Sequence, residues 1–229
     1  MNNDLEAASM IDLRTIAWLT TLALILFGSV AAQPDPDFPE DVDTSHVNTG
    51  VLSFLEQPPE KAVHHHHNDI RITVSSLGDG WVEMNQCHEH LDAVPRAQIL
   101  YREGRIRALR ITAQTAIEAA WVEGHSVQLR NVGKPAKLCV SAETQALRDN
   151  QDGTYTLASG PFMRQFLDGF YPMRVSMSVE FPQELRFLDM SPNQQRGFRV
   201  WEETQRIRLD TWFEGRLRTE IRFDRPRKG

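Results

Sequence analysis

The feature that most constrains this chain is an alternation of apolar and polar side chains with a period of two residues. Successive side chains of a β-strand point to opposite faces of a sheet, so the pattern predicts half-buried strands with one wet face. Shorter runs occur near residues 70–74, 155–157 and 198–200. In the clearest run, Met173, Val175, Met177, Val179 and Phe181 alternate with Arg174, Ser176, Ser178 and Glu180.

Three Glu-Gly pairs predict hairpin turns, because glycine supplies the positive φ that tight turns need. They begin at Glu103, Glu123 and Glu214. The last predicted hairpin pairs residues 207–213 with 217–223, which makes one face apolar and the other rich in arginine. It also places Trp212 opposite Arg218 as a cation–π pair. We expect an interaction surface for an anionic partner on the polar face of this hairpin, made of Arg208, Trp212, Arg218 and Arg222.

One short helix is expected where Ser159 can cap the N-terminus, Pro161 lies in the first turn and Gly169 ends the last. The rest of the body is predicted to form about ten antiparallel strands. The predicted class is therefore all-β, a β-sandwich or a partly open barrel with one short helix. The turn cluster at 149–153 leaves open a division of the body near residue 150.

The N-terminus resembles an export signal. Residues 16–32 carry no charge and end in Val30-Ala31-Ala32, which fits the small-residue rule for signal peptidase. Residues 1–13 contain acids and no base, so a start at Met10 fits a signal peptide better than a start at Met1. We expect a signal peptide over 1–32, with an uncleaved inner-membrane anchor as the alternative, because the apolar run is borderline in length.

Proline and acidic residues then dominate residues 33–68, which hold seven acids and one base. Such a segment buries little apolar surface, so we expect an acidic tether before a body at 69–229. The apolar patch at 51–55 is the exception and is expected to dock on the body as a strand or helix. The net charge of the chain is −6, which argues against nucleic acid as a partner.

Two cysteines occur in the sequence, Cys87 and Cys139. In an exported protein they meet an oxidising compartment and should form a disulfide. In the cytoplasm two separate buried thiols would be expected instead. Their pairing is therefore tied to the export signal.

Histidines form two clusters with possible metal affinity. His88 and His90 would point to the same side of a strand, and His125 in the second predicted turn is a candidate third ligand for copper or zinc. A run of four histidines binds transition metals readily but without fixed geometry. The hydrogen-bonded, structural alternative stays open for both clusters. The candidate metal ligands are His64, His65, His66, His67, His88, His90 and His125.

Catalytic motifs of several kinds are missing from the sequence: H-E-x-x-H, C-x-x-C, the phosphate-binding loop, the dinucleotide fingerprint and a complete nucleophile elbow. No catalytic residue is assigned. We expect an exported periplasmic or envelope protein that binds or assists an envelope protein, polymer or lipid headgroup without catalysis. The alternatives are handling of copper or zinc by the histidines, and hydrolysis of envelope polymers.

Overall fold

The computed structural model of the chain describes residues 48–226, which form fifteen strands and one helix, α1 (Ser76–Asp79). The predicted signal peptide and the first part of the tether, up to residue 47, lie outside the described residues. Within 48–226, no helix has the length and hydropathy needed to cross a membrane.

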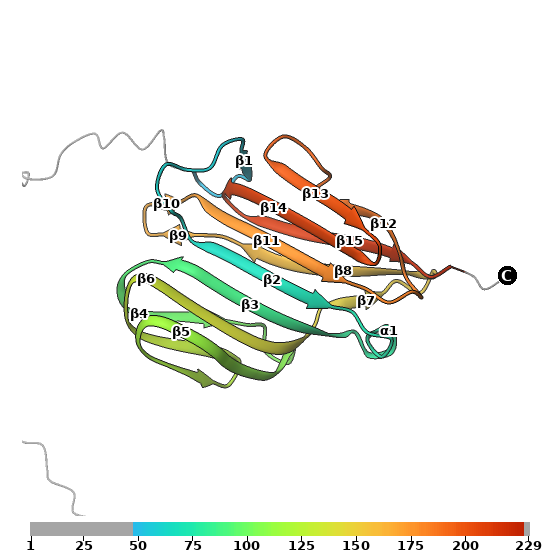
Figure 1. Ribbon diagram of the computed structural model, residues 1–229, viewed down its shortest axis with the longest axis horizontal. Coiled ribbons are helices and arrows are strands. Elements are labelled where there is room, and N and C mark those ends of the chain that lie inside the picture. Colours follow the sequence, from blue (N-terminus) through green and yellow to red (C-terminus); the bar gives the residue numbers. More distant parts are fainter. Residues whose placement is uncertain (1–47, 227–229) are drawn as a thin grey trace, which may run out of the picture. The chain divides into compact units, whose positions relative to one another are not determined.

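Nine of the strands form one large sheet (Figure 1). Its pairing is antiparallel except between β11 and β2, which run parallel. Two of the nine, β13 (Phe198–Glu203) and β5 (Ile106–Glu123), lie off the main order and pair with β14 and β6. The main order is β1 (Ser53–Leu55), β14 (Arg206–Glu214), β11 (Met173–Glu180), β2 (His65–Arg71), β3 (Trp81–Leu91), β6 (Ser126–Gln145) and β4 (Val94–Leu100).

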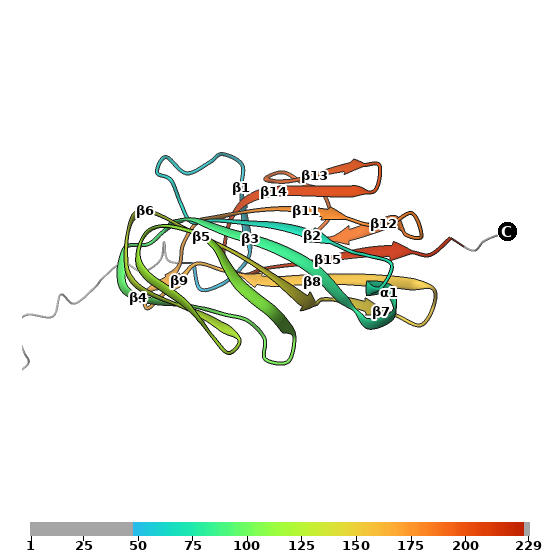
Figure 2. The same ribbon diagram turned by 60° about the horizontal axis from the view of Figure 1, so that its bottom comes forward.

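A second sheet of four strands covers one face of the large sheet (Figure 2). The apolar sides of the two sheets share one core, which includes Val175 from β11, Phe213 from β14 and Phe223 from β15. A short hairpin of β9 (Gln165–Phe166) and β10 (Gly169–Phe170) stands apart. The order of the second sheet is β12 (Arg186–Ser191), β15 (Leu217–Asp224), β8 (Thr154–Phe162) and β7 (Leu147–Asp149).

Strand β6 organises a second, smaller core. Its last ten residues pair with β3, its first seven pair with β4, and β5 follows its other edge throughout. The folded-over strands enclose Val127, Leu129 and Leu138, which are almost fully buried. The large sheet therefore has two apolar regions on its inner side, one against the second sheet and one within this lobe.

The predicted all-β, sandwich-like fold with one short helix is confirmed, and the barrel is not closed. The predicted location of the helix is wrong. Ser159 pairs with Thr219 and Phe162 with Leu217, so this segment is strand β8. Gly160 has a φ of +96°, which no right-handed helix accommodates. Pairing with β15 outweighs the local capping signals.

One predicted hairpin is confirmed and two are wrong. The turn after Glu123 joins β5 to β6, with Glu123 opposite Ser126. Strands β4 and β5 both pair with β6 instead of with each other. Strands β14 and β15 belong to different sheets, because the chain crosses between the sheets at 214–216. Gly215 is required at this crossing, since a Cβ there would lie 2.2 Å from the Val51 carbonyl oxygen.

The apolar patch in the expected tether docks on the body as strand β1, which pairs with β14. Strand β2 begins at His65, so the expected boundary at 68/69 falls inside this strand. The turn cluster at 149–153 joins β7 to β8 within the second sheet. All of the described residues belong to one compact unit.

Candidate functional site on the outer face of the large sheet

The histidine tract is divided between the two faces of the large sheet, because alternate residues of a strand point in opposite directions. His66 points inward and packs edge-on against Phe162, with ring centroids 4.9 Å apart. His65 and His67 point outward and both contact Ser176 on the neighbouring strand β11. We call the side away from the core the outer face.

The inward histidines join a buried polar cluster. His88 Nε2 lies 3.0 Å from the Gln86 side-chain oxygen, which also accepts a hydrogen bond of 2.6 Å from the Tyr101 hydroxyl. That oxygen only accepts, so the proton of His88 is on Nε2 and its Nδ1 is free to accept. His64 Nε2, 3.0 Å from His88 Nδ1, therefore donates to it.

Burial keeps these inner imidazoles neutral at pH 7. It lowers the pKa of His64 to about 4 and that of His66 to about 3, and it holds the pKa of His88 well below its ordinary value. Neighbouring imidazoles lower all three values further, since a second positive charge nearby disfavours protonation. The cluster is therefore a neutral hydrogen-bonded network.

The structure brings together three of the seven predicted metal ligands, His64, His66 and His88. The expectation that His88 and His90 share a side is wrong, because a bulge between Glu89 and Leu91 interrupts the alternation and leaves His90 exposed with a φ of +55°. Across residues 48–226, no group of three or more His, Cys, Asp or Glu side chains is arranged to hold a metal ion. Metal binding stays a prediction from the sequence.

The predicted disulfide between Cys87 and Cys139 is confirmed. The two residues are direct cross-strand partners on β3 and β6, with Cα atoms 4.1 Å apart. Cys87 is also the register partner of His67 on β2. The disulfide therefore joins β6 to β3, the strand beside the one that carries the outer-face histidines.

On the outer face, Ser176 is hydrogen-bonded by two imidazoles. Its Oγ lies 2.7 Å from His65 Nε2 and 2.8 Å from His67 Nδ1. His67 Nε2 lies 3.1 Å from Asp69 Oδ2. A carboxylate only accepts, so Nε2 carries the proton of a neutral His67, and Nδ1 then accepts from the Ser176 hydroxyl. The Ser176 oxygen can still accept, so the Nε2–H group of His65 donates a hydrogen bond to it.

A groove adjoins this serine at His65. Glu89 Oε2 lies 3.5 Å from His65 Nδ1, and Lys137 Nζ lies 2.8 Å from the other Glu89 oxygen. Burial, then the charge of Arg174, lowers the pKa of His65 against the opposing effect of Glu89, so this imidazole is neutral at pH 7. The groove is lined by Pro58, Pro59, Lys61, Ala62, Val63, His65, Glu89, His90, Arg174 and Trp212.

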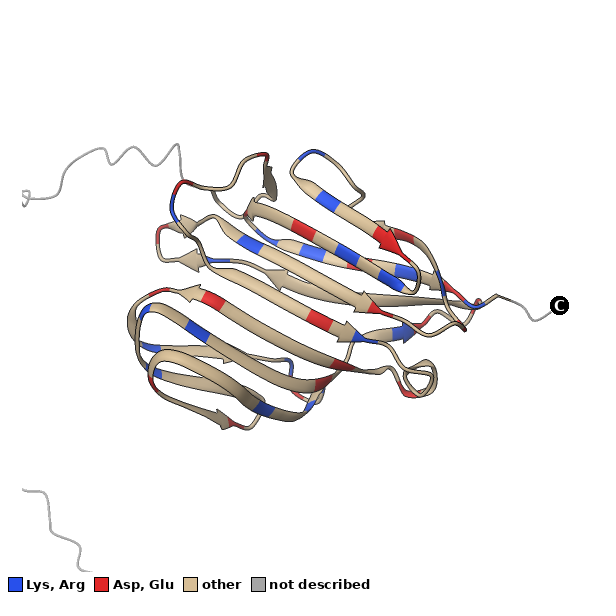
Figure 3. Ribbon diagram, in the orientation of Figure 1, with Lys and Arg blue, Asp and Glu red and all other residues tan. Residues whose placement is uncertain are grey.

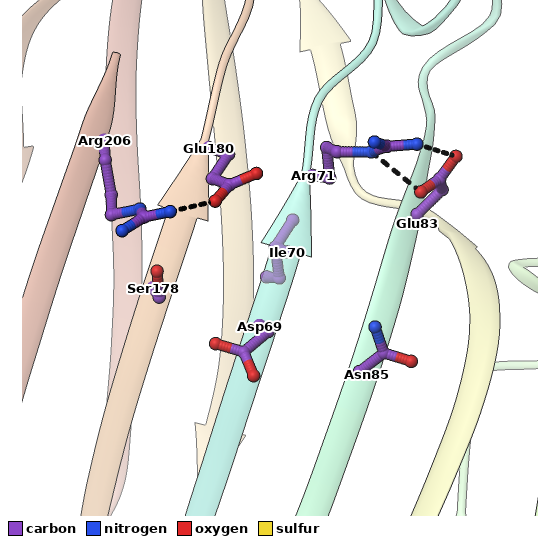
Figure 4. A pocket seen from close by; sticks show the side chains of 8 residues that line it. All are labelled: Asp69, Ile70, Arg71, Glu83, Asn85, Ser178, Glu180 and Arg206. Carbon is purple, nitrogen blue, oxygen red and sulfur yellow. Dashed lines mark hydrogen bonds and ion pairs between the residues drawn. The ribbon is translucent and has the colours of Figure 1, made fainter. Parts of the chain in front are cut away.

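A polar hollow lies around Asp69 and Ser178, further along strands β2 and β11 (Figure 4). Two ion pairs flank it, Arg71 with Glu83 at 2.9 Å and Arg206 with Glu180. Between these pairs lie three polar side chains, Asp69, Asn85 and Ser178, from three adjacent strands. The hollow can hydrogen-bond a polar ligand but offers little apolar surface.

Arginines and tryptophans alternate further along the same face, in a set that we call the Arg–Trp row. The guanidinium carbon of Arg174 lies 4.7 Å from the ring centroid of Trp212, and that of Arg199 lies 5.3 Å from it. Arg199 and Arg208 then lie 5.5 and 5.8 Å from the Trp201 ring. Both basic and acidic residues occur along β11, β13 and β14 in Figure 3. The row consists of Arg174, Trp212, Arg199, Trp201 and Arg208.

One acidic residue, Asp210, forms ion pairs with two arginines of the Arg–Trp row. Asp210 is buried, and it pairs with Arg174 Nε at 2.8 Å and with Arg199. Trp201 is 41% exposed, so its indole is accessible from solvent. Arg174 and Arg199 are thus held in place by a carboxylate that solvent barely reaches, whereas Arg208 pairs with Glu203.

The predicted four-residue interaction surface does not form as one patch. Arg208 and Trp212 belong to the large sheet, whereas Arg218 and Arg222 lie on β15 in the second sheet. The expected pairing of Trp212 with Arg218 is wrong, because Trp212 stacks with Arg174 and Arg199. The cause is the sheet crossing at 214–216, where the local sequence predicts a hairpin.

The sequence reasoning assigned no role to Ser176, Asp69, Glu89 or Arg174. The alternation in β11 did place Ser176 and Arg174 on its wet face. The parallel pairing of β11 with β2 sets these residues beside the histidines, and local sequence does not encode that pairing. No model of a known protein family matches the sequence, and a search of the curated proteins finds no similar one.

Proposed function

We propose that this protein is exported and binds an anionic polysaccharide of the cell envelope through the outer face of its large sheet. The Arg–Trp row is the observation that carries the proposal. Indole rings offer flat apolar surfaces, and guanidinium groups match carboxylates and phosphates in a fixed geometry. Tryptophan and arginine are also the residues most enriched among those that dominate binding energy.

Export is supported by two features that are independent of the row. The uncharged run at 16–32 ends in residues that signal peptidase accepts. The disulfide between Cys87 and Cys139 is compatible with an oxidising compartment, where such bonds persist. Cleavage after Ala32 is tested by the intact mass of the protein recovered from the envelope fraction.

An extended polymer suits this face better than a small molecule. The groove shares Trp212 and Arg174 with the Arg–Trp row, and the hollow shares the same sheet face. A chain of acidic sugar units can therefore place rings on the indoles and charges on the arginines at successive positions. Each contact is weak in water, and repetition along the chain raises the total affinity.

Binding is tested by calorimetry with alginate, a polymer of acidic sugars. Dextran lacks the charge, polyglutamate lacks the sugar ring, and vesicles with anionic lipid present the charge on a membrane. We expect alginate to bind most tightly, with an affinity that falls as salt rises. The double variant Trp201→Ala/Arg208→Glu should weaken alginate binding at least about tenfold, the effect of about 1.4 kcal/mol.

Arg222→Glu is the matched control, since Arg222 is an exposed arginine of the other sheet. It should bind alginate as the natural protein does. Absence of alginate binding, tighter binding of polyglutamate or vesicles, or an equal loss in the control would each overturn the proposal.

A further inference from the structure

We infer that the outer face also carries an ester-hydrolysing centre in which Ser176 is the nucleophile, His67 the general base and Asp69 the residue that orients the base. This activity goes beyond polymer binding. It depends on three side chains outside the Arg–Trp row, and they come from β11 and β2.

The geometry meets the requirements for an activated serine. Such a centre needs the nucleophile and base within hydrogen-bond reach and the base fixed by a third group. Ser176 Oγ to His67 Nδ1 is 2.8 Å, and His67 Nε2 to Asp69 Oδ2 is 3.1 Å. The usual serine hydrolase presents Nε2 to the serine and Nδ1 to the acid. Here the two ring nitrogens exchange these positions, and the order serine, imidazole, carboxylate is kept.

A second imidazole supports the nucleophile. His65 Nε2 lies 2.7 Å from the same oxygen, where its N–H stabilises the negative charge that develops when Ser176 loses its proton. Lys137 compensates the charge of Glu89 behind His65. Ser176 is half-buried and His67 and Asp69 are partly exposed, so a substrate can reach the serine from solvent.

The reaction balances without a cofactor. The Ser176 proton passes to His67 Nδ1 while Oγ attacks the ester carbonyl carbon, and the carbonyl oxygen becomes an oxyanion. The oxyanion collapses, the ester C–O bond breaks, and the leaving alkoxide takes the proton from His67. Water then attacks the acyl-serine, gives a proton to His67 and releases the acid, and Ser176 regains its proton.

The residues around Ser176 indicate which class of ester it can hydrolyse. Arg174 is the next outward residue before Ser176 on β11, and its Nε pairs with Asp210, so its terminal nitrogens are left to donate to the oxyanion. The groove beyond it is lined by Val63, Ala62 and Trp212, which suit a short acyl group. The predicted substrates are therefore carboxylic esters with small acyl chains.

Diisopropyl fluorophosphate tests the nucleophile, because it phosphorylates activated serines and leaves ordinary ones unmodified. Peptide mapping of the full-length, disulfide-bonded protein should find the adduct on Ser176. Ser176→Ala should abolish labelling and should lower kcat for p-nitrophenyl butyrate by about 10²-fold or more. Ser191→Ala, at an exposed position of β12 in the second sheet, should keep both properties.

Asp69 orients the His67 imidazole and does not touch the substrate. A variant at Asp69 should therefore change catalysis without changing the stability of the fold. Asp69→Asn should lower kcat about tenfold or more with little change in KM, while the thermal unfolding midpoint stays within the range of the Ser191→Ala control. Alginate binding should survive in Ser176→Ala, which keeps this test separate from the binding proposal. An unlabelled Ser176 in the folded protein, or equal hydrolysis by Ser176→Ala and the natural protein, would overturn the inference.

Discussion

The two faces of strand β2 place the same residue type in opposite surroundings. On the inner face, His66 is half-buried and packs against Phe162, and desolvation lowers its pKa to about 3. On the outer face, the side chain of His67 is 38% exposed and lies between Ser176 and Asp69. One peptide bond separates a structural imidazole from one that a substrate can reach.

A run of histidines has no fixed geometry of its own. In this protein the sheet gives it one, so that alternate histidines are structural on the inner face and accessible on the outer face. A histidine run on a flexible segment would bind metal ions loosely. Pairing of β2 with β11 and β3 instead fixes every second ring on each side of the sheet. Substitutions on the two faces should therefore differ widely in their effect on stability.

The sharpest contrast in stability is expected between neighbours on β14. Phe213 is fully buried on the inner face, and Trp212 belongs to the outer face. Phe213→Ala should lower the free energy of unfolding by about 3–5 kcal/mol, because a core cavity replaces the ring. Trp212→Ala should cost less than about 1 kcal/mol. Urea unfolding measures both, and similar losses would contradict the assignment of the faces.

Removal of the disulfide should have the next largest effect. Cys87 and Cys139 are 52 residues apart, a loop whose closure contributes about 4 kcal/mol in the chain-entropy model. The double variant Cys87→Ala/Cys139→Ala should therefore unfold about 2–4 kcal/mol more easily. Reductant should destabilise the natural protein and leave the variant unaffected. Equal stability of the two proteins would show that the loop is constrained by other means.

Acid should destabilise the protein through the inner face. The folded pKa of His64 is lowered to about 4, so the unfolded chain takes up a proton first as pH falls. Stability contributed by this group is complete above its unfolded pKa of about 6.5 and is lost between there and about pH 4. At pH 5 the loss is about 2 kcal/mol for this residue.

His64→Gln should reduce the pH dependence of the unfolding free energy between pH 6.5 and 4. His125→Gln, at the turn between β5 and β6, is the control and should retain the full dependence. A slope that is the same in both variants would contradict the role of the buried cluster.

The smallest effect is expected at the ion pair beside the polar hollow. Arg71 and Glu83 are both about half exposed, so water screens their attraction. Arg71→Ala should change the free energy of unfolding by less than about 1 kcal/mol, and added salt should reduce the difference. A loss comparable to that of Phe213→Ala would mean that this face contributes to the core.

The sequence pattern predicts which face of a strand is buried more reliably than it predicts which strand pairs with it. The alternation at 207–213 and 217–223 identified inward residues that are indeed buried, such as Ile207 and Phe223. It could not show that these strands face each other across the sandwich, because a hairpin and a crossing between sheets have the same local pattern. The misplaced helix has a similar cause, since pairing with β15 is a long-range contact.

The outer-face site was harder to predict for the same reason. His65 and His67 are each more than a hundred residues from Ser176 in sequence, and their meeting with it depends on a parallel pairing of β2 with β11. The sequence predicts that His88 and His90, which are two residues apart, act together, but a bulge separates them. The cysteines could be paired because only two exist.

Modification of the folded protein by diethyl pyrocarbonate, read by peptide mapping, tests the division of the histidine tract most directly. The reagent reacts with accessible neutral imidazoles. His67 should be modified rapidly, while His66 and His88 should stay unmodified until the protein is unfolded. Modification of His66 at the rate of His67 in the folded protein would contradict the assignment of these side chains to opposite faces.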